Sequence, residues 1–88
     1  MTWTRETVMT DLVALLGEYA EPGAEINDKS HLVADLGIDS LGVMEILQNI
    51  EDKFGFEIPN DLLTELETVA DVHQAIVTRL QADGRLSG

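Results

Sequence analysis

Apolar side chains recur at every third or fourth position along three stretches of this chain, and this spacing constrains its fold more than any other feature. The spacing matches the roughly 3.6 residues of one α-helical turn, so each stretch predicts a helix with one buried face. No stretch alternates strictly between apolar and polar residues as an exposed β-strand does, and we therefore expect an all-α fold. A chain of 88 residues suffices for one compact domain and is too short for two.

The first two helices are separated by a long loop. The first is expected over about residues 4–20, with Thr4 or Thr2 as its N-cap, and the sequence EPG at 21–23 ends it. The second begins near Ser40 and ends at Gly55. Residues 21–39 form the loop, pinned by scattered apolar side chains: Ile26, Leu32, Val33, Leu36 and Ile38. A loop of this length in so small a domain is unusual unless it is functional.

The second half of the chain predicts two more helices. Pro59 breaks the chain, and Asn60 can cap a short third helix. Thr68 and Asp71 stand at capping-box spacing before a last helix that runs to about residue 82. The expected architecture is a small four-helix bundle with a long first loop and a short third helix. We expect its domain to span residues 1–83 and residues 84–88 to form a disordered tail.

The charge balance excludes several classes of partner. Seventeen Asp and Glu residues stand against five Lys and Arg, and the net charge of -12 repels nucleic acid and anionic membrane surfaces. Basic proteins are therefore the expected partners. No apolar run approaches the roughly 18 residues of a membrane span, so we expect a cytoplasmic protein without membrane insertion.

Catalytic and metal-binding interpretations find little support. The chain has no cysteine, and its histidines, His31 and His73, have no evident triad partner, so we interpret both as solvated surface residues. The stretch DLGIDSLGVMEI is not a calcium-binding loop, because Gly37 and Ile46 stand where ligands are required. We expect neither a catalytic residue nor a metal site.

Ser40 has two possible roles. Asp39 and Ser40 are both good N-cap residues for the second helix, and a capping serine is the simpler interpretation. A helix N-terminus also presents free N–H groups and a positive dipole end, which would stabilise a phosphodiester on the serine oxygen. The pattern alone leaves both roles open.

Acidic and apolar side chains share one side of the second helix. On a helix that begins near residue 40, this side carries Leu41, Glu45, Gln48 and Asp52. A run of charges usually forms a solvated face. The expected exposure of Leu41 and Met44 beside the carboxylates favours a surface that binds basic partners.

Three blocks of sequence resemble the acyl carrier protein family in their order and spacing, over about residues 5–82: DLGIDSL, GVMEILQNIEDKFGFEIP and TVADVHQAI. The family bears 4′-phosphopantetheine on the serine of its D-S-L motif, which is Ser40 in this chain. The resemblance implies that Asp39 helps a phosphopantetheinyl transferase to recognise the site. It implies a docking helix for acyl-loading and acyl-processing enzymes with basic patches, formed by Leu41, Met44, Glu45, Glu51 and Asp52. We expect a monomer.

The resemblance further implies a phosphoprotein that is not an enzyme and that holds acyl intermediates as thioesters in fatty acid, polyketide or related lipid biosynthesis. An aminoacyl or peptidyl carrier is an alternative, and an unmodified acidic helical adaptor is another. Six residues fit a lining of the core and acyl pocket: Val43, Leu47, Ile50, Phe54, Ile58 and Val72. Gly42 lies in the first turn of the docking helix, where we expect it to loosen the site or to let a partner approach.

Overall fold

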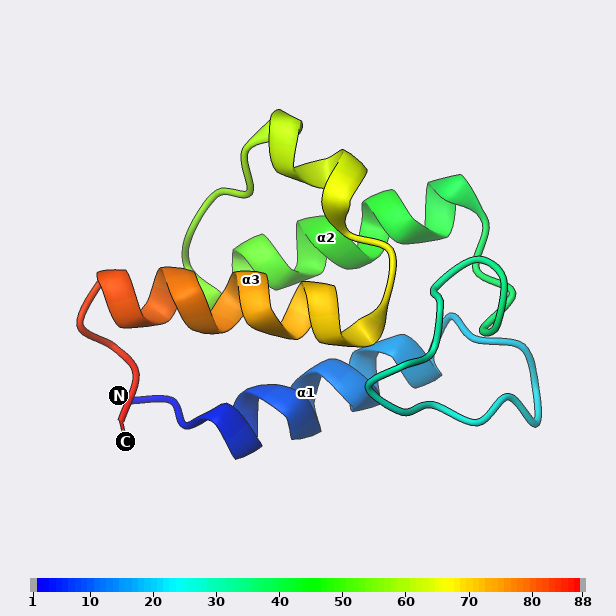
Figure 1. Ribbon diagram of the computed structural model, residues 1–88, viewed down its shortest axis with the longest axis horizontal. Coiled ribbons are helices and arrows are strands. Elements are labelled where there is room, and N and C mark those ends of the chain that lie inside the picture. Colours follow the sequence, from blue (N-terminus) through cyan, green and yellow to red (C-terminus); the bar gives the residue numbers. More distant parts are fainter. Residues whose placement is uncertain (1, 88) are drawn as a thin grey trace.

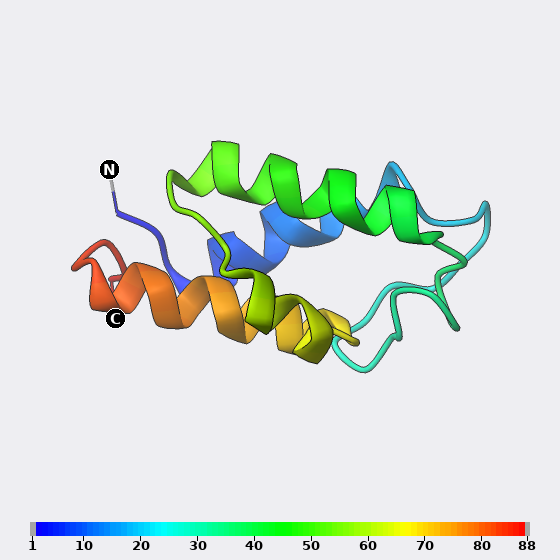
Figure 2. The ribbon, with the colours of Figure 1, turned by 90° about the horizontal axis from the view of Figure 1, so that it is seen from above.

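A computed structural model describes residues 2–87, and that part of the chain contains three α-helices and one short 3-10 helix. The elements are α1 (Arg5–Gly17), α2 (Ser40–Phe54), η1 (Asn60–Glu65) and α3 (Val69–Ala82). α1 packs against both α2 and α3 and runs in the direction opposite to them (Figures 1 and 2). This arrangement confirms the all-α fold with a long first loop and a short third helix. Within the described residues, none of the helices has the length and apolarity to span a bilayer.

The core is formed by the faces that the apolar spacing predicted. α1 contributes Val8, Leu12 and Leu16, and every long helix buries a comparable stripe. Three aromatic side chains close one end of the bundle: the rings of Trp3 and Phe54 lie 4.7 Å apart, and those of Phe54 and Phe56 lie 6.4 Å apart, measured between centroids. With no disulfide in the chain, this apolar burial is the main term that stabilises the fold.

α1 begins where the sequence predicts and ends earlier. The Thr4 hydroxyl oxygen accepts a hydrogen bond from the Thr7 amide at 3.1 Å, so Thr4 is the N-cap and Thr2 is not. The helix ends at Gly17 instead of residue 20. Beyond it, the amide of Tyr19 bonds the carbonyl three residues back, which is the tight turn that commonly closes a helix.

The long loop is held in place by hydrogen bonds as well as by apolar side chains. Ser30 is buried, and its hydroxyl donates to the Glu25 carbonyl at 3.1 Å and accepts from the Asn27 amide at 3.0 Å. The Leu32 amide donates to the Glu67 carbonyl at 2.9 Å, which ties the loop to the start of α3. Of the five apolar residues expected to pin the loop, three are buried and Ile26 is half-buried, but Val33 is exposed.

η1 is a 3-10 helix that starts differently from the prediction. Pro59 occupies the N-cap position and no side chain caps the helix, so the expected capping role of Asn60 is wrong. Instead, the amide of Leu62 donates to the Pro59 carbonyl at 3.0 Å. η1 has no fully buried residue, and Leu62 and Leu63 are half-buried against the core. η1 therefore rests on the bundle through half-buried leucines and is followed directly by the buried Leu66.

Residues 84–87 differ from the disordered tail that the sequence predicts. The Trp3 amide donates to the Arg85 carbonyl at 2.8 Å, and the Ser87 amide donates to the Trp3 carbonyl at 2.7 Å. Leu86 packs against the core beside this bridge. The two ends of the chain therefore lie side by side (Figure 1). Met1 and Gly88, which belong to the expected domain and tail, lie outside the described residues.

The capping box of α3 is confirmed, although Asp replaces the usual Glu or Gln. A carboxylate oxygen of Asp71 accepts hydrogen bonds from the amides of Thr68 at 3.0 Å and Glu67 at 3.1 Å. The Thr68 hydroxyl oxygen accepts from the Asp71 amide at 3.2 Å. The Thr68 amide, and next the Glu67 amide, favour the charged carboxylate and lower the pKa of Asp71 below its usual value of 3.8.

Asp71→Asn should lower the free energy of unfolding at neutral pH by up to about 1 kcal/mol, because the amide side chain is a weaker acceptor for the two N–H groups. A lowered pKa in the folded state means that the carboxylate stabilises the fold above pH 3.8 and loses this contribution as pH falls through the lower, folded value. Urea unfolding over this pH range should show the difference between wild type and variant shrinking in acid. Asp61→Asn is the matched control, and an equal loss there would contradict the assignment.

Candidate functional site

Asp39 is the residue that begins α2. Its backbone is extended, and its carboxylate oxygen Oδ1 accepts a hydrogen bond from the Gly42 amide at 2.7 Å. The Val43 amide donates to the Asp39 carbonyl at 3.0 Å, the first main-chain bond of the helix. Asp39 therefore caps the helix, and Ser40 does not.

Ser40 is the first residue of α2, and it is exposed. Within residues 2–87 its hydroxyl makes no hydrogen bond, and the amides of Ser40 and Leu41 have no acceptor. The hydroxyl is thus free for a covalent bond, and the two amides lie at the positive end of the helix dipole. These residues fit a phosphodiester on the Ser40 oxygen.

Gly42 makes a tight contact between α2 and the end of the loop. A Cβ atom at this position would lie 2.8 Å from Cγ2 of Ile38 and 3.1 Å from Oδ1 of Asp39, and it would touch the ring of Tyr19 at 3.6 Å. Both Gly42 and Ile38 are buried. The expectation that Gly42 loosens the site is therefore wrong, because the absence of a side chain lets the loop close tightly against the first turn.

The backbone just before Asp39 is also held in place by close contacts. Gly37 has a φ of 69°, in the left-handed region that favours glycine, and a side chain there would overlap that of Glu21. The Glu21 amide donates to the Leu36 carbonyl at 2.9 Å. Since Leu36 is also buried, three consecutive residues hold the approach to Asp39: Leu36, Gly37 and Ile38.

The residues expected to form a docking surface differ in how exposed they are. Leu41 and Met44 are 68% and 55% exposed, and Glu45 and Asp52 are also exposed on the same side of α2. Glu51 is half-buried, and its Oε2 atom accepts a hydrogen bond from the Ile58 amide at 2.6 Å. The Glu51 carboxylate is therefore engaged in holding the segment that follows α2.

Two residues between α1 and α2 were not assigned to the site from the sequence. Val33, in the loop, is 53% exposed and is the third exposed large apolar residue of the described chain after Leu41 and Met44. Tyr19 packs on Gly42, and its hydroxyl accepts a hydrogen bond from Asn49 Nδ2 at 3.2 Å. The sequence predicts that Val33 pins the loop, and its exposure could not be foreseen because loop residues follow no regular period. The sequence predicts Tyr19 only as a residue near the end of the first helix, and that position gives no signal of its contact with α2.

The histidines are more structured than expected. Nδ1 of His31 accepts hydrogen bonds from the amides of Val33 at 3.2 Å and Ala34 at 3.0 Å, and so it stabilises the turn before the site. Nε2 of His73 lies 2.9 Å from the carbonyl oxygen of Arg5, linking α3 to α1. Neither histidine makes a hydrogen bond to Ser40. Within residues 2–87, no three acidic or histidine side chains gather as a metal site would require.

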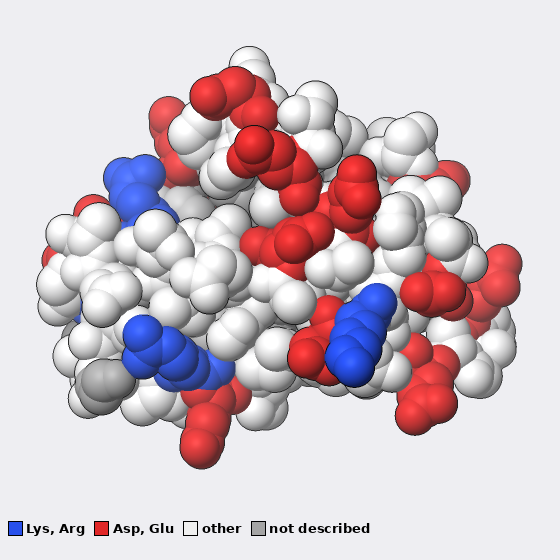
Figure 3. Space-filling view, in the orientation of Figure 1, with Lys and Arg blue, Asp and Glu red and all other residues white. Residues whose placement is uncertain are grey.

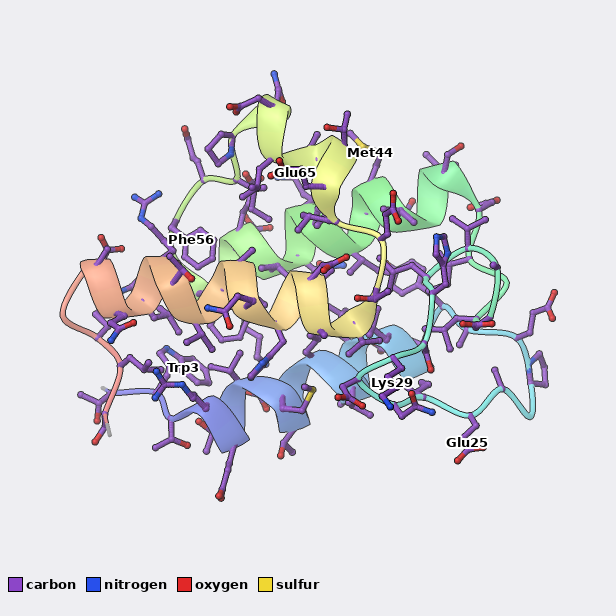
Figure 4. The ribbon with its side chains drawn as sticks, viewed as in Figure 1. Trp3, Glu25, Lys29, Met44, Phe56 and Glu65 are labelled. Carbon is purple, nitrogen blue, oxygen red and sulfur yellow. The ribbon has the colours of Figure 1, made fainter. Side chains whose placement is uncertain are left out.

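An apolar cavity of about 470 Å³ opens between α3, η1 and residues 56–59. Of the six residues expected to line the core and an acyl pocket, Ile58 and Val72 border this cavity. Leu47, Ile50 and Phe54 are buried in the core, as is Val72, and Val43 is half-buried against it. Figure 4 shows Phe56, another lining residue, close to the left end of α3.

Comparisons with known proteins show which proteins this chain resembles. A family model described as "Phosphopantetheine attachment site" matches residues 9–76. An acyl carrier protein of Thermobifida fusca is 41% identical over 73 residues, which cover 82% of this chain and 92% of the relative. An acyl carrier protein of Rhodococcus erythropolis is 38% identical over 86 residues, covering 96% and 92%. The meromycolate extension acyl carrier protein of Mycolicibacterium smegmatis is 39% identical over 74 residues, covering 82% and 74%.

These matches define a domain that carries a phosphopantetheine group, and they extend over most of the chain. The chain belongs to the acyl carrier protein family. Its cofactor is covalently attached 4′-phosphopantetheine.

Gly42→Ala should lower the free energy of unfolding by about 1–3 kcal/mol, because the new methyl group would push against the buried Ile38 side chain. Gly17→Ala is the matched control, since a Cβ there meets only Ile26 Cδ1 at 3.9 Å. The better helix propensity of alanine should leave that variant as stable as wild type or more so. Urea unfolding of both variants measures the difference. A stabilised Gly42→Ala variant would show that the close packing is unimportant.

Proposed function

We propose that this chain carries acyl groups as thioesters on a 4′-phosphopantetheine arm attached to Ser40. The observation that carries the proposal is the exposed Ser40 hydroxyl, left without a hydrogen-bond partner at the N-terminus of α2 and inside the segment matched by the attachment-site model. A phosphopantetheinyl transferase would join the Ser40 oxygen to the phosphorus of the arm, with adenosine 3′,5′-bisphosphate leaving from coenzyme A. The arm supplies the thiol that bears the acyl group.

In this proposal Ser40 is the substrate of a modification and the chain is not an enzyme. No basic side chain of the described residues makes a hydrogen bond to the hydroxyl, and we therefore assign the removal of its proton to the transferase. Asp39 fixes the start of α2 through the Gly42 amide, and this position supports its proposed role in recognition by the transferase.

We assign partner docking to the exposed side of α2. Leu41 and Met44 would enter an apolar socket, and the Glu45 and Asp52 carboxylates would face basic residues of acyl-loading and acyl-processing enzymes. The chain has seventeen acidic residues against five basic ones, which suits this choice of partner. Acidic side chains also predominate over the face with α3 and η1 in front, seen in Figure 3. Glu51 has a smaller part in this surface, because its carboxylate is bonded to the Ile58 amide.

The proposed setting is fatty acid, polyketide or related lipid biosynthesis. Its support is that relatives at 38% and 41% identity are named acyl carrier proteins, and that one relative is named for meromycolate extension. A cytoplasmic location and a monomeric state remain expectations from the sequence.

Incubation with coenzyme A and a broad-specificity phosphopantetheinyl transferase should add one arm to the wild-type chain, as measured by intact mass. Ser40→Ala should gain none, while Ser87→Ala, in the exposed C-terminal segment, should be modified like wild type. The attachment proposal fails if the folded wild type stays unmodified with several transferases, or if Ser40→Ala still gains an arm.

The double variant Glu45→Lys with Asp52→Lys reverses two charges of the docking side. We expect it to lower kcat/KM by about tenfold at low salt, measured with a bacterial transferase that loads malonyl groups onto carrier arms. Salt should reduce the effect because it screens exposed charges. The control pair Glu25→Lys with Asp28→Lys changes the net charge equally, in the exposed loop. Circular dichroism checks that helical content is kept. Equal turnover of both pairs would argue against the docking side of α2.

A further inference from the structure

We propose that the groove between α1 and α2 is a second docking contact, which receives a lysine or arginine side chain of an acyl-processing enzyme. This inference rests on the proposed carrier function and adds α1 to the surface that a partner recognises. Two adjoining hollows form the groove, of about 800 Å³ and 480 Å³. They share Tyr19 of the turn after α1 and Asn49 of α2 as lining residues.

The groove is continuous with the docking side of α2. Met44 and Glu45, which we assign to docking, line the smaller hollow together with Tyr19 and Asn49. The hydrogen bond from Asn49 Nδ2 to the Tyr19 hydroxyl, at 3.2 Å, joins the two walls at the point where the hollows meet. A partner that contacts Met44 therefore already touches the lining of the groove. Because the walls are already linked, little ordering is needed when the partner binds.

The charges of the groove select its occupant. The larger hollow is lined by the carboxylates of Asp11, Glu18 and Asp52, and Lys53 is its only cationic side chain. Lys53 Nζ lies 4.0 Å from an Asp11 carboxylate oxygen, and both side chains are partly exposed, so this pair contributes little and leaves Glu18 and Asp52 unpaired. A cation in the groove would face these carboxylates.

The aromatic ring of Tyr19 adds a contact that suits arginine in particular. A planar guanidinium group can stack on an aromatic face while it donates two hydrogen bonds to a carboxylate. A second copy of this chain is a poor occupant, because two chains that each carry a net charge of -12 repel one another. We therefore commit to a basic segment of a partner enzyme.

Glu18→Lys tests the groove directly, with the malonyl-loading transferase as the probe. The chain is first converted to the arm-bearing form, and intact mass verifies complete modification, so a failure of the carrier function would be seen before docking is measured. Glu18→Lys should then lower kcat/KM at low salt by about threefold to tenfold. Glu25→Lys is the matched control: it changes the net charge equally, and Figure 4 shows Glu25 pointing out of the long loop, away from Met44. It should change kcat/KM by less than about twofold.

Amide chemical shifts give a second readout that does not depend on turnover. Titration of the isotopically labelled, arm-bearing chain with the same transferase should shift the amides of Glu18, Tyr19 and Asn49 as well as those of Leu41 and Met44. Shifts confined to α2 and the loop before it would overturn the proposal. Equal loss of activity in Glu18→Lys and Glu25→Lys would overturn it too, because only the overall charge would then matter.

Discussion

The hydrogen bond from the Gly42 amide to the Asp39 carboxylate, at 2.7 Å, is the interaction on which the site depends. A helix must satisfy its first free N–H groups, and whichever side chain does so is committed to that role. Since Asp39 caps α2, the hydroxyl of Ser40 is left unengaged in the next position. The same bond fixes the direction in which α2 leaves the loop, and thereby the side on which Leu41, Met44 and Glu45 are displayed.

The cap can form only because the chain before it is held firmly. Gly37 provides a left-handed backbone, Gly42 leaves room for the Ile38 side chain, and Tyr19 of the turn after α1 packs on that same glycine. The long loop is thus ordered by a few close contacts and by hydrogen bonds to the start of α3. This order matters in a chain with a net charge of -12, where repulsion between carboxylates opposes compaction.

Much of the fold could be predicted from the sequence, because the period of apolar residues reports directly which faces are buried. The helices, the caps at Thr4 and Thr68 and the terminal Gly55 followed from such local rules. The role of Gly42 could not be predicted, since it depends on Ile38 and Tyr19 meeting α2 in space. Tertiary contacts also decide the engagement of Glu51 by the Ile58 amide and the pairing of residues 85–87 with Trp3.

The candidate site, too, was predictable where it depends on local rules and not where it depends on tertiary contacts. The position of Ser40 at the start of α2 and the exposure of Leu41 and Met44 were local predictions, and the geometry agrees with them. The sequence alone could not decide whether Asp39 or Ser40 caps the helix, because both side chains are able to do so. The wall that α1 adds to the docking side likewise depends on how two helices pack, and the spacing of residues within either helix does not reveal it.

The central claim is that the Ser40 hydroxyl, which does not cap the helix, bears the arm in the cell. Trypsin cleaves after Lys29 and Lys53, so one peptide, residues 30–53, contains Ser40 and only one other serine, Ser30. Fragmentation mass spectrometry of this peptide, from the protein purified out of the cells that make it, is the most direct test. We predict a phosphopantetheine group on Ser40 and none on the buried Ser30. A peptide that carries no arm, or carries it on Ser30, would contradict the account.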